Sequence, residues 1–144
     1  MKKSFSVAWK GSRQPRKQRK YLANAPKHIK HVIMSAHLSK ELKAKYNRRS
    51  VPIKKGDVVK ILIGEYKKKT GKVSIVDLMK MKVAIEGIQI TKKDGTKINV
   101  FFHPSNLLVT ELNLEDKQRT DSLKKENASI KTNSEIKPKH EVKK

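Results

Sequence analysis

The chain has 144 residues, with 36 Lys and Arg against 13 Asp and Glu, which gives a formal net charge of +23. Repulsion between the positive charges opposes compaction, so the excess of Lys and Arg predicts a polyanionic partner. Nucleic acid is the first candidate for this partner and an anionic membrane the second. The sequence contains no Cys, which excludes disulfides and thiolate metal sites. The apolar runs are too short to span a bilayer or to form a secretory signal, so a cytoplasmic location is expected.

The first fifty residues, Met1–Ser50, are predicted to form a basic arm that becomes ordered on its partner. They contain a single acidic residue, Glu41, and every Arg of the chain except Arg119. Their large apolar residues are few, so burial cannot offset an ordering cost of roughly 1–2 kcal/mol per residue for the backbone. The aromatic residues Trp9 and Tyr21 are equally suited to stacking on an RNA base and to packing on protein.

Two short helices are expected within this arm. Pro26 suits a first helical position, and apolar residues from Ile29 to Ile33 follow at helical spacing. Ser39 suits the N-cap of a second helix, which Asn47 would end in the left-handed conformation. Both helices would be marginal in water because they are short.

The middle region, residues 51–112, is predicted to be β. Apolar and polar residues alternate in it, which is typical of half-buried antiparallel strands. The alternating apolar residues are Val59, Ile61 and Ile63; Val73 and Ile75; Met81, Val83 and Ile85; and Ile98, Val100 and Phe102. Asp94-Gly95 marks a hairpin turn. Several short strands in so short a region predict a mainly β fold, a small SH3-like barrel. Val73, Ile75, Val83 and Ile85 are expected to face its core.

The last region, residues 113–144, mixes both signs of charge. A helix is expected around Glu115–Asn127, and the remainder is predicted to be an extended charged tail. The domain organisation expected from the sequence is therefore an arm at 1–50, a barrel at 51–112 and a tail at 113–144.

The stretch from Ile53 to Val76 is predicted to form two strands joined by a basic loop between two glycines. Gly64 and Gly71 flank a loop that carries Lys67–Lys69. Glycine permits a positive φ or a close approach of two backbones, and a basic loop with little bulk can lie against a phosphate backbone. This stretch resembles the KOW motif of small RNA-binding barrels.

The regions around this motif resemble one family. The matching runs are Arg16–Lys20, Asn24–Pro26, Met34–Ala36, Leu38–Leu42, Tyr46–Ser50, Asp94–Thr96 and His103–Asn106. Together they are similar to the universal large-subunit ribosomal protein of the L-twenty-four family, whose eukaryotic branch is called L-twenty-six. The resemblance runs from about Gln14 to Leu112, and the short Gly64–Gly71 loop is more similar to the archaeal branch.

This resemblance implies a structural constituent of the large ribosomal subunit, without enzymatic activity and without a cofactor. It implies binding to 23S-type rRNA near its 5′ domain, early assembly, a position near the polypeptide exit tunnel, and contacts with neighbouring large-subunit proteins. KOW domains also occur in transcription elongation factors, so association with RNA polymerase is the alternative. Such factors usually carry a globular domain before the KOW motif, and residues 1–50 are too poor in apolar residues for one.

The candidate RNA contacts are basic residues of the arm, the loops and the hairpin, together with polar residues after the barrel. They are Arg13, Arg16, Lys17, Arg19, Lys20, Lys27, His28, Lys30, His31, Lys40, Lys43, Arg48, Arg49, Lys54, Lys55, Lys67, Lys68, Lys69, Lys72, Lys92, Lys93, His103 and Asn106. No metal site is predicted, because His28, His31 and His37 lack the further ligands that zinc needs. The carboxylates are scattered, so neither a catalytic site nor a small-molecule substrate is predicted.

Overall fold

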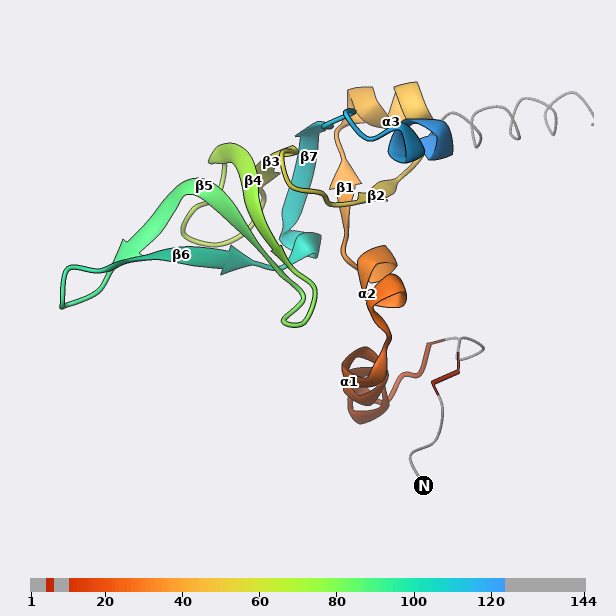
Figure 1. The fold of residues 1–144 in the computed structure, drawn as a ribbon, viewed down its shortest axis with the longest axis horizontal. Helices are drawn as coiled ribbons and strands as arrows, with labels where there is room; N and C mark the ends of the chain where they lie inside the picture. Colours follow the sequence, from red (N-terminus) through yellow and green to blue (C-terminus); the bar gives the residue numbers. More distant parts are fainter. Residues whose placement is uncertain (1–4, 7–10, 124–144) are drawn as a thin grey trace, which may run out of the picture.

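The computed structural model describes residues 5–6 and 11–123, which form a mixed seven-stranded sheet with short helices around it (Figure 1). The strands are β1 Ser35–Leu38, β2 Ser50–Pro52, β3 Val58–Ile61, β4 Thr70–Asp77, β5 Lys82–Thr91, β6 Lys97–Phe102 and β7 Leu107–Glu111. The helices are α1 Pro15–Asn24, α2 Lys27–Ile33, α3 Lys40–Tyr46 and the 3-10 helix η1 Pro104–Asn106. The prediction of a mainly β fold, with short helices in the basic arm, is confirmed.

The strand order is β2-β1-β7-β3-β4-β5-β6, and the strands wrap around one apolar core in a small barrel-like fold. All pairings are antiparallel except that of β1 with β7, which is parallel. The fully buried core side chains include Met34, Leu38, Ile53, Val59, Ile61, Val73, Val83, Ile85, Leu107, Val109 and Leu123. Val51 of β2 is also buried, so the core draws on every strand from β1 to β5, on β7 and on the C-terminal helical residues.

The long strand β5 belongs to two different parts of the fold. Its first residues pair with β4 on one side and with the end of β6 on the other, whereas its last residues pair with β6 alone in a hairpin that extends away from the barrel (Figure 1). The predicted turn is confirmed, because Lys92 N donates to Thr96 O at 2.9 Å and Gly95 has a φ of +80°. Ile98 lies in this extension and is 40% exposed, so the alternating apolar residues of β6 do not all face the core.

A bulge in β4 explains why Ile75 is not a core residue. Val73 pairs with Ile85 and Ile75 with Ala84, so β4 has one more residue here than β5. The additional residue, Ser74, reverses the alternation of inward and outward side chains. Val73 is consequently buried as predicted, whereas Ile75 is 45% exposed and the prediction that it faces the core is wrong.

The alternation in β3 ends earlier than the sequence pattern does. Val59 and Ile61 are buried, but the strand stops at Ile61 and the chain turns into a loop. Ile63 therefore lies outside the sheet with 62% of its surface exposed, and the prediction that it continues the alternation of this strand is wrong.

The end of the basic arm contributes to the core. Met34, Ala36 and Leu38 are almost fully buried, and β1 is held between β2 and β7. The expectation of an arm with too little burial to fold is therefore wrong for this part of Met1–Ser50. The sequence did carry a signal, because these apolar residues alternate with Ser35 and His37. The division into 1–50, 51–112 and 113–144 itself stays a prediction.

The ends of α3 follow the capping rules read from the sequence. The Ser39 hydroxyl accepts a hydrogen bond from Leu42 N at 3.3 Å, and Asn47 ends the helix with a φ of +50°. Glu41 lies in the first turn and Lys43 in the last, as the helix dipole favours. Both predictions for this helix are confirmed.

The other helices differ more from the predictions. Helix α2 follows Pro26, which is its N-cap rather than its first residue. Helix α1 was not predicted. Residues 117–123 are helical, in agreement with the expected helix around Glu115–Asn127 as far as the described residues extend. Trp9 and residues 124–144, the expected tail, lie outside the described residues.

Candidate nucleic-acid interface

Most of the candidate RNA contacts have exposed side chains. His31, Arg48, Lys54 and Asn106 are half-buried, and Lys30 is only 5% exposed, which makes it the least accessible of the set. The candidates occur in the arm helices, the β2–β3 and β3–β4 loops and the tip of the β5–β6 hairpin. They are therefore spread over several faces of the fold rather than gathered in one patch.

Helix α1 carries a cluster of exposed basic side chains. Pro15 begins the helix, where its missing N–H costs nothing, and Arg16–Lys20 follow with four bases. None of the residues of α1 is buried, and the helix lies away from the sheet (Figure 1). The Tyr21 ring packs on Phe5 with 4.8 Å between centroids, so this aromatic has a protein contact. Helix α1 thus presents basic side chains outside the barrel.

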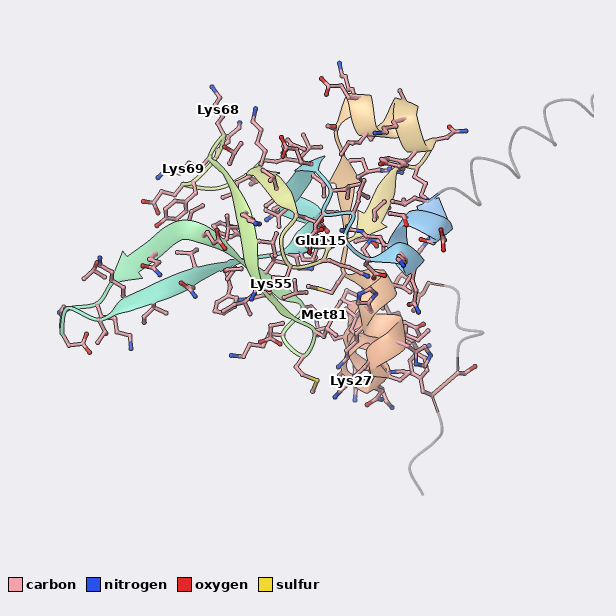
Figure 2. The ribbon with its side chains drawn as sticks, turned by 45° about the horizontal axis from the view of Figure 1, so that its top comes forward. Lys27, Lys55, Lys68, Lys69, Met81 and Glu115 are labelled. Atoms are coloured by element: carbon pink, nitrogen blue, oxygen red, sulfur yellow. The ribbon has the colours of Figure 1, made fainter. Side chains whose placement is uncertain are left out.

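The β3–β4 loop holds its lysines on a closed backbone turn. Ile61 N donates to Lys69 O, and Lys68 N donates to Ile61 O, each at 2.9 Å. The Lys69 ammonium lies 5.0 Å from the centroid of the Tyr66 ring, a cation–π contact. Figure 2 shows Lys68 and Lys69 pointing away from the sheet at the opposite end of the molecule from Lys27 of α2.

The two glycines of this loop have the two different roles that the sequence left open. Gly64 has a φ of +101°, which an L side chain rarely adopts. Gly71 lies within β4 and is needed for space instead. A Cβ atom there would lie 2.6 Å from Ile85 Cγ2 and 3.1 Å from Glu86 O. Gly64 is therefore favoured by its backbone angle, and Gly71 by the close approach of Ile85 and Glu86.

A buried ion pair, which sequence reasoning missed, organises the β2–β3 loop. Arg119 Nη1 lies 2.6 Å from Asp57 Oδ1, and Nη2 lies 2.8 Å from Oδ2. The side chains are 4% and 0% exposed. Asp57 also accepts from Lys54 N and Asn113 N, both at 2.9 Å. Arg119 donates in addition to Asn113 O at 2.9 Å and to Pro52 O at 3.1 Å.

This pair attaches the C-terminal helical residues to the loop that carries Lys54 and Lys55. A second link is the salt bridge from Lys54 Nζ to Asp116, and this hydrogen bond lowers the pKa of the Asp116 carboxyl. The sequence held only a weak signal, namely an isolated Arg119 outside the arm. The pair joins residues 62 positions apart, so no local pattern reveals it.

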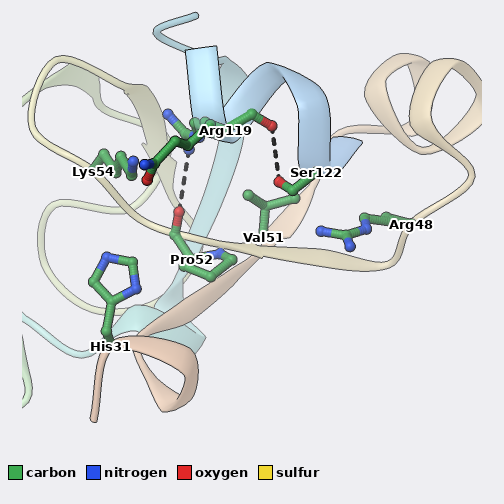
Figure 3. Close-up of a pocket in the computed structure, with 8 residues that line it drawn as sticks. His31, Arg48, Val51, Pro52, Lys54, Arg119 and Ser122 are labelled. Carbon is green, nitrogen blue, oxygen red and sulfur yellow. Dashed lines mark hydrogen bonds between the residues drawn. The ribbon is translucent and has the colours of Figure 1, made fainter. Parts of the chain in front are cut away.

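Two concave sites share His31 and Lys54. The first encloses about 200 Å³, and Figure 3 shows its lining side chains with Arg119 hydrogen-bonded to Pro52 O. The second is an open groove of about 570 Å³. It is lined by His31, Ile53, Lys54, Lys55, Ser74, Ile75, Val76 and Leu78. The β2–β3 loop thus lies between two basic hollows, next to α2.

The remaining candidates are distributed around the sheet. Lys40 and Lys43 lie on α3, Arg48 and Arg49 between α3 and β2, Lys72 in β4, and Lys92 and Lys93 at the hairpin tip. His103 has a structural contact, because its Nδ1 atom accepts from Ser105 N at 3.3 Å and caps η1. His103 therefore shapes the turn before η1. Asn106 follows in the same turn.

Within residues 5–6 and 11–123, no three His, Cys, Asp or Glu side chains gather as a metal site would require. In the same part of the chain, no helix is long and apolar enough to cross a membrane. The dominant chemical feature of the described surface is its positive charge, which suits a phosphate backbone.

Comparison with known proteins identifies the family. Residues 12–126 match the model that describes the ribosomal proteins L26 of eukaryotes and their archaeal L24 counterparts. This chain belongs to that family. A relative named large ribosomal subunit protein uL24 from Methanosphaera stadtmanae is 48% identical over 112 residues, covering 78% of this chain and 96% of the relative. The protein of the same name from Korarchaeum cryptofilum is 45% identical over 119 residues, covering 83% and 91%.

The family match corrects one boundary of the resemblance seen in the sequence. That resemblance ended at about Leu112, whereas the match continues to residue 126. The helical residues 117–123, with Arg119 and Leu123, therefore lie within the part of the chain that the family model covers. The resemblance to the archaeal branch agrees with the archaeal relatives.

Proposed function

We propose that the protein is a structural, non-enzymatic constituent of the large ribosomal subunit that binds 23S-type rRNA near its 5′ domain. The observation that carries the proposal is the family match over residues 12–126, on a chain with a formal net charge of +23. The relatives named as large-subunit proteins, which it matches over nearly their whole length, support the same subunit. The alternative of a polymerase-associated KOW factor receives no support from the family match.

The proposal includes the place and time of binding. The protein acts in the ribosome of the cytoplasm, joins assembly early and lies near the polypeptide exit tunnel beside neighbouring large-subunit proteins. The family resemblance supports these details. Exposed Lys and Arg side chains lie at opposite ends of the fold. This arrangement suits a protein that lies between several RNA segments, because each end can neutralise the phosphate backbone of a different segment.

The candidate residues act by contacting phosphates. The arm supplies nearly all the Arg side chains, whose planar forks suit phosphate oxygens and base stacking. The β3–β4 loop supplies Lys67–Lys69 on a fixed turn. Phosphate contacts position a protein on RNA and carry little sequence information directly. Cognate recognition then depends on the shape of the rRNA and on any bases that the protein reads.

Sedimentation of a tagged protein from lysate tests the subunit. Co-migration with large subunits after a high-salt wash is expected, because a structural constituent remains bound when loosely held proteins dissociate. Co-purification with RNA polymerase and absence from the large-subunit fraction would contradict the proposal.

Filter binding to a 5′-domain rRNA fragment tests the phosphate contacts. Replacing Lys67–Lys69 with Ala should reduce the log–log salt slope by roughly 0.7–0.9 for each phosphate that is no longer neutralised. The matched control replaces Lys80, Lys82 and Lys97, which are also exposed. It removes the same charge from positions outside the candidate set, so its slope should stay close to that of the wild type. Equal slopes in both variants would show that the loop lysines only contribute to the overall charge.

A further inference from the structure

The open groove between α2 and β4 combines an apolar floor with a basic rim. Ile75, Val76 and Leu78 supply apolar surface from β4 and the turn after it, while His31 of α2 and Lys55 of the β2–β3 loop contribute polar groups. No carboxylate is among the described residues that line it. Its volume of about 570 Å³ lies within the range of sites that bind small organic groups.

The bulge in β4 creates the floor of this groove. Without the additional residue, Ser74, the side chain of Ile75 would point into the core. The Ser74 hydroxyl instead donates to Ala84 O at 3.2 Å, which fixes the bulge against β5. Ile75 therefore lies within a strand with 45% of its surface exposed. Bulges often redirect a side chain next to a functional site.

The rim is held in place by contacts outside the groove. Lys54 is bound to Asp116, and its backbone N–H is held by Asp57. These contacts fix the loop that presents Lys55, whose side chain is exposed. The nearby carboxyl of Asp77 accepts from the backbone of Met79 and Lys80, so it is engaged in its own turn.

We propose that this groove binds one unstacked RNA base on Ile75, with a neighbouring phosphate on Lys55. The inference rests on the proposed function and makes it more specific, since it adds a base-reading site to the phosphate contacts. The flat face of a base is apolar and matches the apolar residues of the groove, while the anionic phosphate of the same nucleotide chain matches Lys55. RNA loops and bulges offer such bases, whereas a paired helix does not. An acidic peptide with apolar side chains is the competing occupant.

The test compares two isoleucines of similar exposure. Ile75→Thr keeps a β-branched residue in β4 but removes apolar surface, and Ile98→Thr makes the same change in the β5–β6 hairpin, where Ile98 is 40% exposed. Both full-length variants are titrated with a single-stranded RNA oligonucleotide and with its duplex form. Thermal melts of the two variants serve as the control for folding.

Ile75→Thr should weaken binding to the single strand by about three- to tenfold and leave duplex binding and the salt slope unchanged, because apolar contact between a base and Ile75 involves no counterion release. Ile98→Thr should behave like the wild type. Lys55→Ala should weaken binding to both RNAs and make the salt dependence shallower.

Three outcomes would overturn the inference. If the wild type binds RNA with a steep salt slope but the two Thr variants behave alike, the groove holds no base and the proposed function still stands. If Ile75→Thr binds RNA normally but co-sediments less with large subunits, the occupant is a protein segment. If the wild type does not bind RNA at all, the proposed function fails and the inference fails with it.

Discussion

Arg119→Met should destabilise the fold more than any substitution of an exposed Lys or Arg residue. In the native structure the Asp57 carboxylate is 0% exposed, and the guanidinium of Arg119 meets both of its oxygens. Methionine fills much of the space of the arginine stem but carries no charge and no donor. The substitution therefore leaves a buried carboxylate with only the backbone N–H groups of Lys54 and Asn113 as partners.

The expected loss is about 3–5 kcal/mol, the usual cost of removing one partner from a buried ion pair. The loss has two components. The carboxylate stays desolvated without its counter-charge, and the carbonyls of Pro52 and Asn113 lose their donors. Total stability of a domain is about 5–15 kcal/mol, so the variant should lose a large fraction of it.

Urea unfolding followed by circular dichroism measures this loss, and a double-mutant cycle with Asp57→Ala separates the pair from its surroundings. The double variant should cost about as much as either single variant, because the second substitution removes the unpaired group that the first one leaves. Arg16→Met, in exposed α1, is the matched control and should change stability by less than about 0.5 kcal/mol. A loss below about 1 kcal/mol for Arg119→Met, or additive losses in the cycle, would refute the reasoning.

The remaining predictions concern the core, the loop and pH. Val83→Ala should lower the free energy of unfolding in urea by about 1–3 kcal/mol, whereas Lys82→Ala should change it little. If Lys82→Ala were the more destabilising, the register assigned to β5 would be wrong by one residue. Gly71→Ala should cost about 1–3 kcal/mol in the same assay by overpacking, and an unchanged midpoint would contradict this. The pKa of Asp116 is lowered by Lys54, so the stability it provides is present above its unfolded pKa and lost as pH falls through its folded value. The difference in melting temperature between the wild type and Asp116→Asn should therefore vanish in acid, and a difference that persisted there would contradict the linkage.

Local chemistry made parts of this fold predictable. A cap such as Ser39, a left-handed end such as Asn47 and a turn such as Asp94-Gly95 each depend on a few neighbouring residues. Sequence patterns therefore predict them directly. The KOW-like loop belongs to the same class, because Gly64 is required by its own backbone angle.

The features that the sequence did not predict depend mainly on contacts between residues far apart in the chain. Strand β1 is stabilised by β7, and residues such as His37 and Leu108 that pair there are far apart in the chain. The Asp57–Arg119 pair has the same character, since each residue taken alone is an ordinary charged residue. The bulge at Ser74 is hidden for a different reason. A bulge leaves no mark in the alternating apolar pattern of the sequence, yet it reverses which side chains face the core.

The placement of the acidic residues explains how so basic a chain presents its charge. Three carboxylates serve internal contacts: Asp57 binds Arg119, Asp116 binds Lys54, and Asp77 caps the turn after β4. The hydrogen bond from the backbone N–H of Lys80 lowers the pKa of Asp77, which favours the charged form of this carboxyl in the turn. These acids hold the loops in position rather than pairing with the lysines of the β3–β4 loop or the hairpin tip. The fold thus keeps its positive charge on the surface, where an RNA backbone can neutralise it.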